Sequence, residues 1–319
     1  MQNEKKNWLL GIIMSIVPVV VFLLGNLIIS SIVQLFYVPG IMAKALGDGG
    51  GMEKLQDSVW LTEQLMNSSY VAVASLASDL LISVGIFFWW RAVRKPEVQV
   101  KNAFTGKKFV FLVFTGIAIQ VTLNVIMALV FFILPESVSE DYQMLSGELT
   151  GDGSTSLAMA LTVVVAAPIA EDLLMRGLAL NYGRKYMNDT AAVIITSVAF
   201  GCMHFTNAQL APLSGVIIQV VYATAIGVVL AIVAIKFKSV WAAVFVHFIV
   251  NGSAQLISLI SGNVKNEDIV GYCFYAVGIV AIVGMIIMIK KKMITSPDAP
   301  TYGEIEMAKK VAAAAETAE

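Results

Sequence analysis

Long apolar runs, separated by short links that carry most of the charged residues, dominate this sequence. A helix needs roughly 20 mostly apolar residues to cross the hydrocarbon core of a membrane, where its backbone polar groups must bond within the helix. Eight runs meet this requirement, although the fifth is short: 8–38, 70–90, 109–134, 156–180, 190–205, 215–236, 240–260 and 270–289. With 58% hydrophobic and 13% charged residues, the chain cannot be an ordinary soluble domain. We therefore predict an all-α, polytopic membrane protein.

Basic residues of the links collect on one side of the predicted bundle. They lie before the first run, in every second link and after the last run: Lys5, Lys6, Arg91, Arg94, Lys95, Lys101, Lys107, Lys108, Arg184, Lys185, Lys236, Lys238, Lys290, Lys291 and Lys292. The links on the other side carry an acidic excess or no charge. Because Lys and Arg are enriched in cytoplasmic loops, both termini are expected in the cytoplasm. Since the basic residues are dispersed, no nucleic-acid partner is expected.

The predicted bundle covers residues 1–295, and the tail covers residues 296–319. The tail is rich in Ala, Glu and Lys, so we expect a disordered or loosely helical cytoplasmic segment without chemistry of its own. No internal repeat of the kind found in transporters is evident in the bundle.

The segment AlaGluAspLeuLeuMetArgGly, residues 170–177, places two adjacent acids in an apolar run. An ionised side chain inside a membrane costs several kcal/mol unless it is paired, so Glu171 and Asp172 are functional candidates. On a helix Asp172 lies on the same face as Arg176, four residues later, in the order that favours an ion pair. Glu171 is turned by about a quarter of a turn from that face. We predict that Asp172 pairs with Arg176 while Glu171 faces a cavity.

The only two histidines, His204 and His247, both lie inside apolar runs. Asn251 follows His247 by four residues, so the two polar side chains stack on one helix face. One buried histidine is usually structural, but two of them with Asn251 and an acidic pair favour a shared polar site inside the bundle.

Asp79, in the second run, is the other acid inside the membrane. It could belong to a substrate or ion path. We expect instead that a polar neighbour satisfies it, and we leave it outside the site; the candidates are Gln120, Asn124 and Gln219.

A glutamate and two histidines can hydrolyse a bond in two ways. They can hold a divalent metal such as Zn²⁺ with an open position for a water molecule, whose pKa the metal lowers to about 7. Alternatively Glu171 acts as a general base, and the imidazoles with Asn251 bond to the developing oxyanion. The spacing does not separate the two, and the HisGluXaaXaaHis zinc motif is absent from the sequence.

Three motifs in order resemble those of the CAAX-protease and bacteriocin-processing family of intramembrane proteases, which includes type II CAAX prenyl endopeptidases. They are GluAspLeuLeuMetArgGly, PheGlyCysMetHis and HisPheIleValAsn, within a core of about residues 157–255. The family patterns are GluGluXaaXaaXaaArg, PheXaaXaaXaaHis and HisXaaXaaXaaAsn. The sequence departs from them at Asp172, where the family usually has Glu.

The resemblance implies four catalytic residues: Glu171, His204, His247 and Asn251. By this resemblance Glu171 activates water with His204 as its partner, and His247 with Asn251 binds metal or the oxyanion. Asp172 and Arg176 would support the first motif. A metal, with zinc expected first, would be held by Glu171, His204 and His247.

The leading hypothesis is an intramembrane metalloendopeptidase of a bacterial cell membrane that cuts a lipid-linked or hydrophobic peptide. Some relatives act in bacteriocin self-immunity, so a non-catalytic membrane immunity or peptide-binding protein is the alternative. An ion-coupled carrier is the third hypothesis. We expect the cavity to open toward the cytoplasm near Arg184 and Lys185, which would hold a carboxylate-bearing peptide end; the alternative is an outward opening near Gln209.

Overall fold

The computed structural model describes residues 7–47, 68–150, 157–261, 267–294 and 298–316, with single residues or pairs at 53, 56–57, 60 and 263. Within these residues the chain is helical and forms no β-strand. Eight of its helical segments are long and apolar enough to cross a membrane. The predicted fold class, an all-α membrane bundle of eight spans, is therefore confirmed.

Seven of the spans are single helices over most of their length: α1 (Trp8–Leu35), α5 (Ser68–Val93), α7 (Gly106–Ile133), α12 (Asp189–Met203), α13 (Leu213–Phe237), α14 (Val240–Ser261) and α15 (Glu267–Lys290). The fourth span is built from five pieces: α9 (Leu157–Leu161), η1 (Thr162–Ala166), α10 (Ala167–Asp172), η2 (Leu173–Ala179) and α11 (Leu180–Tyr186). Shorter helices lie between or after the spans: α2 (Val38–Gly47), α6 (Val100–Ala103), α8 (Glu136–Thr150), η3 (His204–Gln209) and α16 (Tyr302–Glu316).

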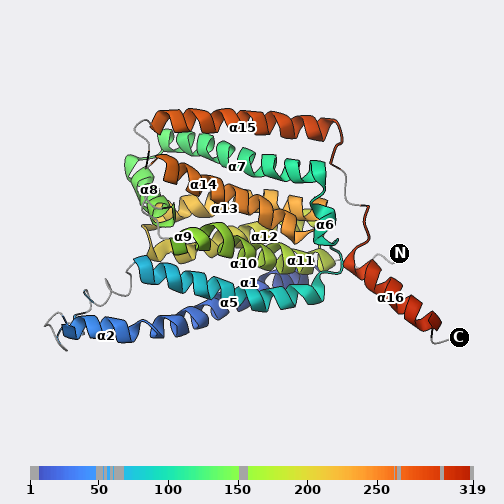
Figure 1. Ribbon diagram of the computed structural model, residues 1–319, viewed down its shortest axis with the longest axis horizontal. Coiled ribbons are helices and arrows are strands. Elements are labelled where there is room, and N and C mark those ends of the chain that lie inside the picture. Colours follow the sequence, from blue (N-terminus) through green and yellow to red (C-terminus); the bar gives the residue numbers. More distant parts are fainter. Residues whose placement is uncertain are drawn as a thin grey trace.

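The fourth span lies in the middle of the bundle (Figure 1). Helices α1 and α5 pack against it on one side, and α14 packs against it on the other. Beyond α14 follow α7 and α15, while α12 and α13 pack against each other. Helix α8 lies at one end of the bundle, and α6, α11 and α16 lie at the opposite end (Figure 1).

The fourth span departs from regular α-helix at two places. Both η1 and η2 are π-helical turns, and α10 between them has Pro168 in its first turn. Proline has no N–H, and its ring clashes with the carbonyl four residues earlier, which is a common cause of such distortions. The acidic pair Glu171 and Asp172 thus ends the short α-helical piece between two irregular turns.

The second half of this span is buried against α5 at the end of the bundle where α11 lies. Leu174, Leu178 and Trp90 are fully buried in one cluster. A Cβ atom at Gly177 would lie 2.8 Å from Trp90 Cδ1, so a glycine is needed for α5 to approach the span this closely. This packing closes the end of the bundle at which α11 lies.

Glu97, in the link after α5, joins three parts of that end. Its carboxylate is 5% exposed and accepts hydrogen bonds from Trp90 Nε1 at 2.7 Å and from the backbone N–H of Val240 at 2.9 Å. The backbone N–H of Tyr302 at the start of α16 donates to the Glu97 carbonyl at 2.7 Å. Burial raises the pKa of Glu97 to about 7, against the opposing effects of the hydrogen bonds from the Val240 backbone and from Trp90 and of the charge of Arg94.

We expect the thermal unfolding midpoint in detergent to fall as the pH rises from about 5 to about 8. Glu97 has a pKa of about 7 in the folded protein and an ordinary value of 4.5 in the unfolded chain, so between these values the unfolded state binds fewer protons. The free energy of unfolding is then highest below pH 4.5. It falls by about 3 kcal/mol at most as the pH rises through about 7.

Glu97→Gln should flatten this dependence, whereas the exposed Glu148→Gln should leave it as in the wild type. The measurement is the unfolding midpoint of each variant across the pH series. Identical profiles for Glu97→Gln and the wild type would mean that Glu97 stays ionised throughout.

Candidate active site

The four residues expected at the site line one cavity of about 1300 Å³ inside the bundle: Glu171, His204, His247 and Asn251. Phe200 brings the two imidazoles to a common depth, because its ring contacts both edge-on, with centroids 5.1 Å from His204 and 5.9 Å from His247. The end of α12 therefore reaches deep enough to meet the middle of α14. The expectation that these side chains share one cavity is met.

Asp172 is turned away from the cavity and joins two buried partners. Its Oδ1 lies 2.8 Å from Arg176 Nη1, and its Oδ2 accepts a hydrogen bond of 3.0 Å from His247 Nδ1. Arg176 also donates to the Gly227 carbonyl at 3.1 Å, and its guanidinium stacks on Phe200 at 4.3 Å. The predicted pairing of Asp172 with Arg176 is confirmed, and its bond to His247 is an addition that the sequence did not reveal.

This hydrogen bond decides which nitrogen of His247 faces the cavity. A carboxylate accepts only, so Nδ1 carries the proton and Nε2 is left as the free nitrogen. That Nε2 lies 3.9 Å from Glu171 Oε2, which is too long for a hydrogen bond but suits a water molecule bonded to both. Glu171 is 21% exposed, whereas Asp172 is fully buried, as their different helix faces require.

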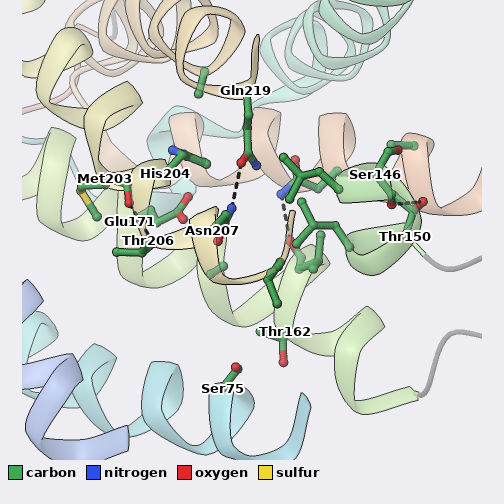
Figure 2. A pocket seen from close by; sticks show the side chains of 18 of the residues that line it. Ser75, Ser146, Thr150, Thr162, Glu171, Met203, His204, Thr206, Asn207 and Gln219 are labelled. Atoms are coloured by element: carbon green, nitrogen blue, oxygen red, sulfur yellow. Dashed lines mark hydrogen bonds between the residues drawn. The ribbon is translucent and has the colours of Figure 1, made fainter. Parts of the chain in front are cut away.

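His204 is oriented by the backbone of its own helix. Its Nδ1 lies 3.0 Å from the Phe200 carbonyl, one turn earlier, so Nδ1 donates and Nε2 is free. Figure 2 shows His204, Glu171, Asn207 and Gln219 around one pocket. Asn207 Nδ2 donates to Gln219 Oε1 at 2.8 Å. These two amides were not predicted as site residues, because no motif marks them.

Asn251 bonds to the irregular part of the fourth span. Its Nδ2 donates to the Val163 carbonyl at 2.8 Å. The N–H of Ala167 bonds to the Thr162 carbonyl, five residues earlier, and the next N–H in that pattern would reach Val163 but belongs to Pro168, which has none. Asn251 thus supplies the hydrogen bond that the proline removes, and one N–H of its amide remains for other partners.

These residues do not form a metal site as they are arranged. Among the described residues, no group of three His, Cys, Asp or Glu side chains is close enough to hold a metal ion. The Nδ1 atoms of both imidazoles are already bonded to other groups. The free Nε2 atoms and Glu171 are groups that zinc accepts, but the three-residue set expected from the sequence does not converge on one point.

The cavity reaches the end of the bundle at which α8 lies. Its lining includes Ser146 and Thr150 of α8 and Gln209 of η3, and no Lys or Arg among the described residues lines it. The expected opening near Arg184 and Lys185 is wrong, because the packing around Trp90 and Leu178 closes that end. The alternative, an opening near Gln209, agrees with the lining.

Asp79, which the sequence analysis left outside the site, lines the same cavity. Its partner is also not among those expected: Asn26 Nδ2 donates to Asp79 Oδ1 at 3.5 Å. Its position in the middle of an apolar run singled out Asp79 in the sequence. The rotation of α5 about its axis decides which side chains Asp79 contacts, and the sequence does not give that rotation.

One family model, described as Type II CAAX prenyl endopeptidase Rce1-like, matches residues 153–253. The match covers all four expected catalytic residues and nearly the whole predicted core. A search of curated proteins and a search of solved structures each gave no match. The family resemblance inferred from the motifs is confirmed.

Proposed function

We propose that this membrane protein hydrolyses a peptide bond inside its cavity, because residues 153–253 match the family model described as Type II CAAX prenyl endopeptidase Rce1-like. The substrate class is a hydrophobic or lipid-linked peptide that reaches the cavity along the membrane. One observation carries the proposal: Glu171 Oε2 and His247 Nε2 face each other across 3.9 Å, with His247 held from behind by Asp172.

In the proposed reaction a water molecule donates hydrogen bonds to Glu171 and to His247 Nε2. Glu171 takes a proton as the water oxygen attacks the peptide carbonyl carbon, and it returns the proton to the amide nitrogen as the C–N bond breaks. Amide N–H groups of Asn207 and Asn251 line the cavity and are available to the oxyanion. The buried Arg176–Asp172 pair keeps the His247 ring in one orientation.

We further propose an orientation with both termini in the cytoplasm of a bacterial cell. The distribution of Lys and Arg supports it. In that orientation α8 and the opening near Gln209 lie on the non-cytoplasmic side, so the substrate comes from outside the cell or from the outer leaflet.

The experiment is digestion by the protein reconstituted in lipid vesicles. A peptide library, with and without attached acyl or prenyl chains, is incubated with the vesicles and the products are identified by mass spectrometry. We expect cleavage by the wild type and none by Glu171→Gln prepared in the same way. Binding of peptides without cleavage by the wild type would instead support a peptide-binding immunity protein.

Removal of divalent metals is a separate prediction. Since the described side chains do not converge as a metal site, we expect cleavage to continue after dialysis against EDTA. The measurement is the cleavage rate before and after dialysis, with and without added Zn²⁺. A loss that zinc restores would show that Glu171, His204 and His247 close around a metal, as the resemblance implied.

A further inference from the structure

We propose that Asp79 forms a subsite that binds a positively charged group of the peptide, either a Lys or Arg side chain or a free N-terminal ammonium. This inference rests on the proposed function, because it names the substrate class of the same cavity. It concerns a residue on α5, outside the three motifs and outside residues 153–253.

Asp79 belongs to a polar site that is built from two helices. Ser30 Oγ on α1 lies 2.9 Å from Asn26 Oδ1 and 3.1 Å from Ser78 Oγ on α5. The bond to its oxygen fixes the Asn26 amide, so its Nδ2 points to Asp79 Oδ1 at 3.5 Å. Asn26, Ser30 and Asp79 all line the cavity. The carboxylate is thus held in place by a neutral partner, which orients its charge without compensating it.

The Asp79 carboxylate lacks a positively charged partner within the described protein. A carboxylate inside a membrane bundle is costly unless a positive group faces it. None of the described ion pairs includes Asp79, and the described lining of the cavity contains no Lys or Arg. A cationic group of a bound peptide would supply the partner that the protein itself does not.

The route into the cavity is negatively charged, as Asp79 is. Helix α8, whose Ser146 and Thr150 line the cavity, has four acidic residues and no basic one: Glu136, Glu140, Asp141 and Glu148. Acidic residues along a path with apolar walls attract cations and repel anions. A peptide end with a free carboxylate would meet Asp79 and Glu171 without a cation, so the earlier expectation of a carboxylate-bearing end is reversed.

Asp79 is also placed to select the cleavage position. Helix α5 packs against α10 and η2, the pieces of the fourth span that hold Glu171 and Arg176. A cation bound at Asp79 therefore sits at a fixed distance along the peptide from the bond that is attacked by the water beside Glu171. Cleavage should occur at a constant number of residues from the positive charge.

The test compares three forms of one peptide cleaved by the vesicle preparation: with lysine, with Nε-acetyl-lysine, and with an acetylated N-terminus. We expect the wild type to cleave the peptide with both free amines with a kcat/KM at least about tenfold higher than one of the two acetylated peptides, mainly through a lower KM. Loss of the preference on lysine acetylation assigns the cation to a side chain, and loss on N-terminal acetylation assigns it to the terminus.

Asp79→Asn should remove the preference, so that the charged and the acetylated peptides are cleaved with similar kcat/KM. Asp79→Glu keeps the charge and should keep the preference, which guards against a variant that simply folds poorly. Glu306→Gln, which changes an exposed acid of α16 at the opposite end of the bundle, should retain it. A wild type without preference, or an Asp79→Asn variant that keeps it, would overturn the proposal.

A binding measurement separates this inference from the proposed function. Glu171→Gln is titrated with the charged and the acetylated peptide, and their dissociation constants are compared. Tighter binding of the charged form, together with no cleavage by the wild type, would support the Asp79 subsite and refute only the peptidase. Equal binding, with cleavage intact in the wild type, would refute only the subsite.

Discussion

Glu171→Gln is expected to lower the cleavage rate about 10³-fold or more while the protein remains folded. A general base contributes roughly 10²–10⁴ to a rate, and glutamine cannot take the proton from water. The fold should survive because Glu171 faces the cavity, and its contact with His247, at 3.9 Å, is too long for a hydrogen bond. The measurements are the cleavage rate and the thermal unfolding midpoint of the same preparation.

The neighbouring acid provides the control. Asp172→Glu keeps a carboxylate for Arg176 and His247, and it introduces the residue usual in the family, so activity should remain within about tenfold. Asp172→Ala should instead destabilise the protein by about 3–5 kcal/mol, because it leaves Arg176 buried without its partner. Equal loss of activity, with intact folding, from Glu171→Gln and Asp172→Glu would mean that their roles are assigned wrongly.

The second large effect is expected at Asn251. Asn251→Ala leaves the Val163 carbonyl without a donor, and an unsatisfied buried group costs about 1–3 kcal/mol. The π-helical turn η1 before α10 then shifts. Glu171 lies less than two helical turns after the end of η1, so it moves relative to His247. We expect cleavage to fall about 100-fold with a modest decrease in the unfolding midpoint.

Pro168→Ala should restore the activity of Asn251→Ala. Alanine returns the missing backbone N–H, so the helix can satisfy the Val163 carbonyl itself, either in the π pattern or in the regular α pattern. The double variant should recover to within about tenfold of Pro168→Ala alone. If Asn251 acts only as an oxyanion donor, the double variant will stay as inactive as Asn251→Ala.

Gln255, one turn further along α14, is the matched control for this rescue. Its Nε2 donates to the Thr150 carbonyl at 2.7 Å, so it also bonds a backbone carbonyl of another helix. Any loss caused by Gln255→Ala should not be restored by Pro168→Ala, because proline plays no part in that hydrogen bond.

Features that depend on one helix at a time could be predicted from the amino-acid sequence alone. Run length and composition decide which segments can cross a membrane, and all eight spans were predicted from them. Helical periodicity fixes which side chains share a face, so the Asp172–Arg176 pair and the separate direction of Glu171 followed from spacing alone. The resemblance to the family could also be inferred from these short motifs, since their residues are local in the chain, and a family model matches residues 153–253.

Contacts between helices depend on tertiary packing and could not be predicted from the sequence. The Asp172–His247 bond, the bond of Asn251 to Val163 and the place of Asp79 in the cavity each join segments at least about 50 residues apart. They depend on how each helix is rotated and how deep it sits, which packing around Phe200 and Trp90 sets and hydrophobicity does not. For the same reason the opening of the cavity was predicted at the wrong end: charge marks the ends of the helices, but side-chain packing decides which end is closed.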